Sequence, residues 1–302
     1  MLARLQRLMA ASIVLASLAW LAGAWALGHP WLAVAGFLFV LLGYTLVLGT
    51  EFVLLAFLHR DDPTPRAGPW QLIRAWFCEC IVAARVFGWR QPFRSRALPD
   101  VPGRPGVRGI VFVHGYLCNR GLWNPWLKRC MAVQQPCIAV SLEPVFSELD
   151  AYVQTVDRAV TQLERETGSA PLLVCHSMGG LVARAWLSSV AGADARVHHV
   201  VTIGTPHQGT WLARLSRTAN ARHMRPSGDW LRQLAHREPA SRAAKFTCFY
   251  GHADNIVIPP AAAILPGAAS RHLSHTAHMA MAFHPDVISE VSRWLDADGA
   301  LS

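Results

Sequence analysis

The stretch Leu172-Leu173-Val174-Cys175-His176-Ser177-Met178-Gly179-Gly180 decides the fold that we expect for this chain. An apolar run ends in a serine, and small residues follow it. This pattern predicts a buried strand, a sharp turn with Ser177 at its apex, and then a helix. Acyl-transfer enzymes present a serine nucleophile in this way. The stretch departs from the Gly-x-Ser-x-Gly pattern at one position, because Cys175 stands where the first glycine is expected.

Around this stretch, from Val107 onward, segments typical of strands alternate with segments typical of helices. Such alternation predicts an α/β fold, in which a mostly parallel sheet carries helices on both faces. The predicted strands cover 107–113, 137–142, 172–175, 197–203, 246–250 and about 271–273, and the predicted helices cover 123–132, 149–166, 178–190 and 285–295.

The residues that follow these strands include a possible set of catalytic groups. Functional groups gather at the carboxyl ends of the strands in a parallel sheet. Ser177 and Asp254 each follow a strand, and His275 and His278 follow the last short one. His114-Gly115-Tyr116 follows the first strand. We therefore expect Ser, Asp and His to converge at one edge, in that order along the chain.

This arrangement resembles the α/β-hydrolases of the lipase and esterase type over about residues 107–297. The order Ser, Asp, His belongs to that fold. Residues 114–116 resemble the oxyanion segment of lipases, residues 202–209 resemble a stretch frequent in bacterial lipases, and residues 251–257 resemble the loop that bears the catalytic acid. The resemblance leaves residues 1–106 unexplained.

The resemblance also implies a role for each group. A serine hydroxyl needs a base to take its proton, and a histidine can act as that base at neutral pH. Asp254, the only acid between Glu238 and Asp286, fits the carboxylate that orients the imidazole. By the pattern of the family, the backbone N–H groups of Tyr116 and Met178 form the oxyanion hole.

Three histidines are candidates for the base: His275, His278 and His284. In similar hydrolases the base precedes a short apolar run and then a helix that ends near a Trp-Leu pair. Residues 279–283 and 285–295 match this pattern after His278, which is therefore the predicted base, with His275 as the alternative. His284 could cap the last helix without a chemical role.

Cys175 can be interpreted in three ways. Small residues are needed on both sides of the nucleophile because the turn packs closely against the helix. Cysteine is small, so we interpret Cys175 as a tolerated variant. The alternatives are that Ser177 is not catalytic, or that Cys175 is itself the nucleophile. The remaining motifs argue against the first, and the expected burial of Cys175 argues against the second.

Two uncharged apolar stretches, Leu8–Leu27 and Trp31–Thr50, lie near the start of the chain. A helix of about 20 apolar residues can span a bilayer, so residues 1–60 are predicted to form a transmembrane hairpin. A cleaved signal peptide is the alternative for the first stretch, but its apolar core would be shorter, at about 7–15 residues. Glu51 falls near the inner end of the second span, and we assign it no role.

The basic residues beside the two spans predict their orientation. Arg4 and Arg7 precede the first span, and the hairpin turn contains no Lys or Arg. Arg60, Arg66 and Arg74 follow the second span. The positive-inside rule therefore places both ends in the cytoplasm, with the catalytic domain on the cytoplasmic side of a bacterial-type inner membrane.

Two further segments have alternative interpretations. Residues 61–106 are predicted to be a juxtamembrane linker, with an amphipathic helix over 70–87 that either lies on the membrane or packs on the catalytic domain. Within the catalytic domain, residues 107–302, the alternation of strands and helices stops between about 210 and 245. This Arg-rich stretch is predicted to be a helical cap that either touches anionic lipid or turns its arginines to water.

The amino-acid composition indicates which binding partners to expect. The chain is 52% hydrophobic and only 16% charged, against about 25% charged in soluble domains. Its net charge of +9 suits nucleic acid or an anionic membrane, and the apolar segments favour the membrane. Seven irregularly spaced cysteines without a CxxC pair indicate neither a disulfide framework nor a zinc site. No cofactor, metal or nucleic-acid partner is expected.

The predicted function is that of a membrane-anchored serine hydrolase, an esterase or lipase that cleaves carboxylic esters through Ser177, Asp254 and His278. The alternatives are an acyltransferase or thioesterase that uses the same three residues, and a non-enzymatic membrane scaffold.

Overall fold

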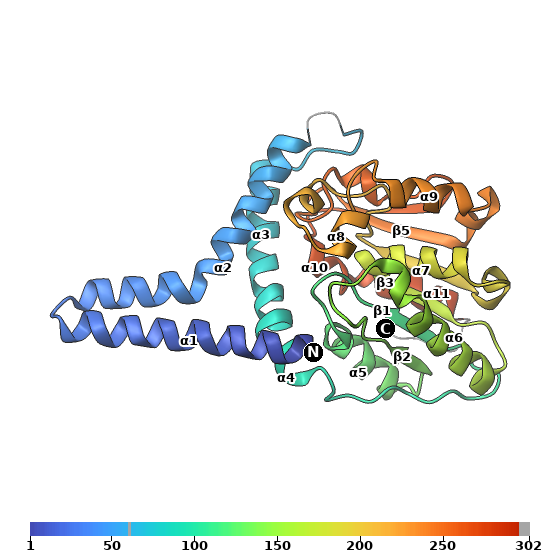
Figure 1. Ribbon diagram of the computed structural model, residues 1–302, viewed down its shortest axis with the longest axis horizontal. Helices are drawn as coiled ribbons and strands as arrows, with labels where there is room; N and C mark the ends of the chain where they lie inside the picture. Colours follow the sequence, from blue (N-terminus) through green and yellow to red (C-terminus); the bar gives the residue numbers. More distant parts are fainter. Residues whose placement is uncertain (60–61, 296–302) are drawn as a thin grey trace.

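The computed structural model describes residues 1–59 and 62–295. Arg60, which contributes to the orientation argument, lies outside these residues. Figure 1 shows two parts, an α/β body and a helical hairpin that projects from one side of it. The helix α3, Pro69–Ala83, stands between them.

The body is built on a six-stranded sheet in which every neighbouring pair is parallel, in the order β2-β1-β3-β4-β5-β6. This confirms the predicted α/β fold. The strand before the serine, β3, lies inside the sheet and is buried along its whole length, as expected for a strand that is covered on both faces. The strands are β1 Ile110–Val113, β2 Cys137–Ala139, β3 Leu172–His176, β4 His199–Ile203, β5 Phe246–Gly251 and β6 Ala269–Leu273.

Helices cover both faces of the sheet because alternate side chains of each strand point to opposite faces. Leu173 and Cys175 of β3 pack with α6 and α7 in one apolar cluster. Leu172 and Val174 pack with α5 and α11 in another. The helices of the body are α5 Asn124–Ala132, α6 Val153–Thr167, α7 Met178–Ser189, α8 Ala219–His223, α9 Asp229–Arg237, α10 His278–Met281 and α11 Pro285–Trp294, and short 3₁₀ helices (η2 to η7) cover Arg120–Trp123, Leu149–Tyr152, Ala193–Arg196, Trp211–Leu215, Ala240–Lys245 and Pro260–Ala263.

The predicted cap segment folds onto the body. The indole N–H of Trp230 donates to Asp150 at 2.7 Å, and the amide of Asn220 donates to the carbonyl of Val145 at 2.8 Å. Leu234 of α9 is fully buried. The apolar side of this segment therefore packs inward.

Ahead of the body, two helices are long and apolar enough to cross a membrane. These are α1, Leu2–Ala26, and α2, Pro30–Leu58. They pack together where the indole of Trp20 donates to the carbonyl of Leu32 at 2.9 Å. The first turns of α1 instead contact α4, Gln91–Arg94, and the body, where the amide of Gln6 donates to Gln91 at 2.8 Å and to the carbonyl of Leu117 at 3.2 Å.

The second helix is shared between the hairpin and the body. Figure 1 shows α2 running beside α1 and then turning to run beside α3. From Tyr44 onward it contacts α3, because the Tyr44 hydroxyl donates to Cys80 at 3.2 Å and the Trp76 indole donates to Thr45 at 2.9 Å. Only the first half of α2 therefore leaves the body with α1, although the sequence predicts a span that reaches Thr50.

The predicted amphipathic helix is α3, Pro69–Ala83, which continues through a π-helical turn, η1 Ala84–Arg90, into α4, Gln91–Arg94. One face of α3 packs on the body and buries Glu79 and Cys80. The opposite face exposes large apolar side chains, namely Trp70, Ile73 and Phe77. The buried face fits the interpretation of a helix that packs on the catalytic domain, and contact of the exposed face with a membrane stays a prediction.

Candidate active site

Ser177 lies at a strained turn between β3 and α7. Its φ of 55° and ψ of −129° are unusual for a residue with a side chain. The turn is held by the N–H of Ser177, which donates to Ile203 at 2.8 Å, and by the hydroxyl of Thr205, which donates to the Ser177 carbonyl at 2.8 Å. The residue is only 6% exposed. This is the strand–turn–helix geometry that the sequence predicts.

Two glycines allow the chain to pack closely around Ser177. A Cβ on Gly179 would lie 2.4 Å from the carbonyl oxygen of Val113, so no larger residue fits there without displacing β1. A Cβ on Gly115 would lie 2.7 Å from the Cβ of Ser177. The His-Gly-Tyr segment that follows β1 therefore lies directly against the serine.

Cys175 is buried within the sheet, where it joins the apolar cluster beneath α7. The thiol thus takes the place of the missing glycine without displacing the turn. Burial raises the pKa of this thiol far above its usual range, so the sulfur stays protonated. This state argues against Cys175 as the nucleophile, because the thiolate is the reactive form.

Asp254 and His278 form a buried pair at the same edge of the sheet. The Nδ1 atom of His278 lies 3.0 Å from Oδ1 and 3.1 Å from Oδ2 of Asp254. Oδ1 of Asp254 also accepts the backbone N–H groups of Ile256 and Val257, each at 2.9 Å. Asp254 is 1% exposed and His278 is 3% exposed. The acid is therefore fixed by its own loop, and its hydrogen bond holds Nδ1 of the imidazole.

The other two candidate histidines have different surroundings. His275 is exposed, and its backbone N–H points toward Nε2 of His252 at 3.5 Å. His284 caps α11, where its Nδ1 atom accepts the N–H of Asp286 at 3.2 Å. The geometry thus favours His278 over both as a possible base.

His176 joins the serine turn to the segment that bears His278. Its Nε2–H donates to the carbonyl of His278 at 3.1 Å, and the two rings lie 4.7 Å apart. Burial lowers the pKa of His176 to about 3, so its ring stays neutral. Among the described residues, no hydrogen bond joins the Ser177 hydroxyl to His278. In the absence of substrate, such catalytic hydrogen bonds are often long or poorly aligned.

The predicted oxyanion donors lie on the two segments that meet at Ser177. Met178 begins α7 directly after the serine, and Tyr116 follows Gly115. Among the described residues, neither backbone N–H donates to another group. The side chain of Tyr116 points to the cap, with its hydroxyl 3.2 Å from that of Thr218. The role of these two amides as oxyanion donors stays a prediction.

The structure adds two carboxylates to which the sequence analysis assigned no role. Glu79 of α3 accepts hydrogen bonds from the backbone N–H groups of Met279 and Ala280, directly after His278. Glu51 of α2 accepts one from the side chain of Asn255. A signal for Glu79 exists, since it is the only acid in an otherwise apolar and basic stretch from 69 to 99. Nothing in the local sequence pairs Glu51 with Asn255.

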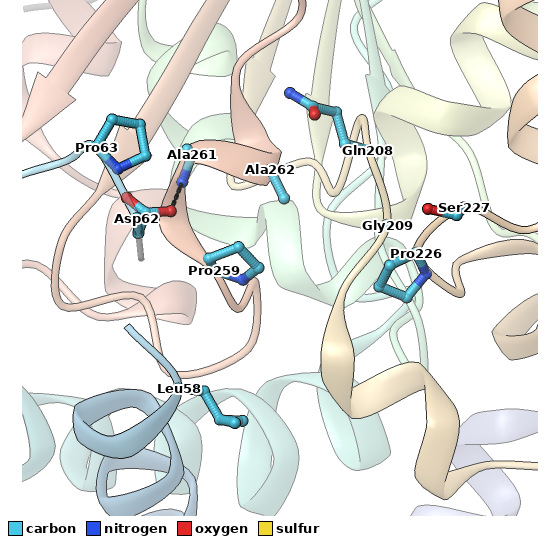
Figure 2. A pocket seen from close by; sticks show the side chains of 10 residues that line it. All are labelled: Leu58, Asp62, Pro63, Gln208, Gly209, Pro226, Ser227, Pro259, Ala261 and Ala262. Atoms are coloured by element: carbon cyan, nitrogen blue, oxygen red, sulfur yellow. Dashed lines mark hydrogen bonds between the residues drawn. The ribbon is translucent and has the colours of Figure 1, made fainter. Parts of the chain in front are cut away.

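A cavity of about 340 Å³ lies beside this edge, lined by the end of α2, the turn at 208–209, the cap and residues 259–262. Figure 2 shows the hydrogen bond in which Asp62 accepts the backbone N–H of Ala261, at 3.0 Å. The cavity is lined by none of the predicted catalytic residues. The hydrogen bond between Asp62 and Ala261 shows instead that the chain just after α2 contacts the segment that follows the acid loop.

Comparison with known proteins identifies the fold of this chain. Residues 147–281, which include Ser177, Asp254 and His278, match the family of PGAP1-like alpha/beta domains. The mature lipase BlEst2 of Bacillus licheniformis is similar over 61% of this chain and 90% of its own, with a TM-score of 0.52 and 18% identity. Lipase B of Aspergillus fumigatus is similar over 69% of this chain and 58% of its own, with a TM-score of 0.57 and 18% identity. No curated protein sequence matches the chain.

The two lipases share the architecture at low identity, so they establish the fold and leave the residue roles to the geometry described above. The chain therefore has the α/β-hydrolase fold of lipases and esterases, and two long apolar helices precede it.

Proposed function

We propose that this protein is a membrane-anchored serine hydrolase that cleaves carboxylic esters through Ser177, His278 and Asp254. The observation that carries the proposal is the buried Asp254–His278 pair, which lies at the same sheet edge as the strained turn of Ser177. The two solved structures with a similar fold are both named as lipases, and this supports the proposal.

The proposed reaction proceeds in two stages. The Ser177 hydroxyl attacks the ester carbonyl while Nε2 of His278 takes its proton, and Asp254 stabilises the imidazolium through Nδ1–H. The amides of Met178 and Tyr116 bind the oxyanion of the tetrahedral intermediate. The intermediate collapses, the alcohol leaves with the proton from His278, and the acyl group stays on the serine. Water, deprotonated by His278, then releases the acid and restores the hydroxyl.

The same proposal assigns α1, from Leu8 onward, and the first half of α2 to the bilayer. The uncharged stretch Leu8–Leu27 is 20 residues long, which gives a helix of about 30 Å, the thickness of the hydrocarbon core. Arginines flank the hairpin only on the side of the body, so both ends are placed in the cytoplasm.

The orientation of α3 supports this placement. Figure 1 shows α3 lying crosswise to the hairpin, which is the direction of a helix that rests in a membrane surface. Its exposed Trp70, Ile73 and Phe77 face away from the body, and such side chains are typical of interfacial helices. The active site would then lie beside a bilayer, and lipid esters are its expected substrates.

The pH dependence of hydrolysis tests the proposed base. Burial alone lowers the pKa of His278, but the charge and hydrogen bond of Asp254, helped by nearby glutamates, raise it above its ordinary value of 6.5. Only neutral His278 can accept the serine proton, so activity is lost as the pH falls through this raised pKa. We expect kcat/KM to fall about tenfold per pH unit on the acidic side of a midpoint above 6.5. A midpoint below 6.5 would contradict the assignment.

Substrate class is tested with the full chain in detergent or in vesicles. We expect hydrolysis of p-nitrophenyl esters and, at a higher rate, of phospholipid or acylglycerol esters presented in vesicles. Addition of an alcohol or a thiol acceptor separates the reaction classes, because an acyltransferase passes its acyl group to the acceptor instead of water. Free acid as the main product supports a hydrolase, whereas a transferred acyl group as the main product overturns that part of the proposal.

A further inference from the structure

We infer that Glu79 and Glu51 are positioning residues that hold the loop bearing His278, so that the N-terminal helices complete the active site as well as anchor it. The inference rests on the proposed catalytic role of His278. It adds a role for residues before 107, which the resemblance to hydrolases leaves unexplained. Both carboxylates reach the loop from outside the α/β body.

Glu79 binds the chain directly after the base. Its Oε1 atom accepts the N–H of Met279 at 2.8 Å, and its Oε2 atom accepts the N–H of Ala280 at 3.2 Å. These N–H groups begin the short helix α10, whose first residue is His278. Glu79 is 1% exposed, so water cannot replace it as the acceptor. A buried N–H without a partner costs about 1–3 kcal/mol.

Glu51 acts on the same loop through one intermediate residue. Its Oε2 atom accepts the side-chain N–H of Asn255 at 2.6 Å. The Oδ1 atom of Asn255 in turn accepts the backbone N–H of His278 at 3.2 Å. Asn255 is fully buried and follows Asp254 in sequence. One amide side chain thus links α2 to both the acid loop and the base.

The two carboxylates also add negative charge near the imidazole. Both raise the pKa of His278, after the larger effect of Asp254. Burial raises the pKa of Glu79 itself to about 7, although its two hydrogen bonds and the charge of His278 lower it. The ionisable groups that face Glu79 are His278, Asp254 and the neighbouring Cys80. A neutral side chain at position 79 would therefore change the titration of His278 as well as the packing of its loop.

This charge effect distinguishes positioning from a merely structural role. A structural contact would affect stability and leave the titration of the folded protein unchanged. Glu79→Gln keeps the shape but removes the charge and one acceptor. Glu79→Asp keeps the charge. Glu148→Gln, at an exposed glutamate, removes one charge far from this loop in the sequence and serves as the matched control.

The experiment measures the His278 pKa by NMR on the full chain in micelles, with ¹³C-labelled histidine and the signal identified by its loss in His278→Asn. In Glu79→Gln we expect a lower His278 pKa and faster hydrogen exchange at Met279 and Ala280. Glu79→Asp and Glu148→Gln should keep the titration of the unaltered protein. Unchanged titration and exchange in a folded Glu79→Gln variant would overturn the inference. Neither readout needs activity, so an inert wild-type protein would count against the proposed function alone.

Kinetics then measure the consequence for catalysis. We expect kcat to fall about tenfold in Glu79→Gln and about a hundredfold in Glu79→Ala, in line with the loss of charged hydrogen bonds. The acidic limb of the pH profile should move to lower pH in both. Glu51→Ala, which leaves the Asn255 side-chain N–H without its acceptor, should lower kcat with little change in KM. If KM alone rises in these variants, the carboxylates act on substrate binding and the inference is wrong.

Discussion

Ser177→Ala is expected to abolish ester hydrolysis, with kcat lower by on the order of 10⁶-fold, while the protein remains folded. The variant removes the atom that forms the acyl-enzyme, and no neighbouring group can replace it. The thiol two positions earlier in the chain, Cys175, is buried and protonated. Initial rates with a p-nitrophenyl ester measure the effect, and circular dichroism verifies the fold.

Ser189→Ala serves as the matched control, because Ser189 is an exposed serine at the end of the same helix. It should retain full activity. If Ser177→Ala kept more than about one hundredth of the wild-type rate, far above the residual activity of enzymes without their nucleophile, the assignment of the nucleophile would be wrong.

His278→Ala is expected to lower kcat by on the order of 10⁶-fold, since the serine then lacks the base that accepts its proton. The loss should be nearly as large as for the serine, because the members of such a triad act as a unit. His275→Ala is the comparison variant, and it should change kcat by less than a factor of about three. The reverse result, an inactive His275→Ala with an active His278→Ala, would transfer the role of base to His275.

Much of this site can be predicted from the sequence because it depends on short-range patterns. Ser177 follows a continuous apolar run, and such runs form the buried strands of parallel sheets. Asp254 and His278 follow later strands of the same sheet, so their convergence needs only the rule that carboxyl ends meet at one edge. The parallel sheet that this reasoning requires is confirmed.

Strand lengths and the path of α2 are less accessible to sequence reasoning. The predicted strand at 137–142 ends at Ala139, because the N–H of Leu142 donates instead to the ring of His114 at 3.0 Å. The turn of α2 toward α3 depends on contacts such as that between Tyr44 and Cys80, 36 positions apart. Apolar periodicity identifies a helix but not the partner of each of its faces.

The contacts of Glu51 and Glu79 illustrate the same limit. An acid in an apolar helix is conspicuous in a sequence, but its partner is not. Glu79 bonds to backbone groups 200 and 201 positions away, and any residue type could supply these. The pairing of Glu51 with Asn255 spans 204 positions. These contacts can therefore be identified only from the folded structure and not from the sequence.

Covalent labelling of the full chain with a fluorophosphonate tests the central claim most directly, because this reagent traps an activated serine without any assumption about the substrate. The folded protein in detergent is treated with the reagent, digested and mapped by mass spectrometry. We expect one adduct per chain, on Ser177, and none in Ser177→Ala. Labelling should be strongly slowed in His278→Ala and unaffected in His275→Ala. A folded wild-type protein that carries no adduct on Ser177 would contradict the account.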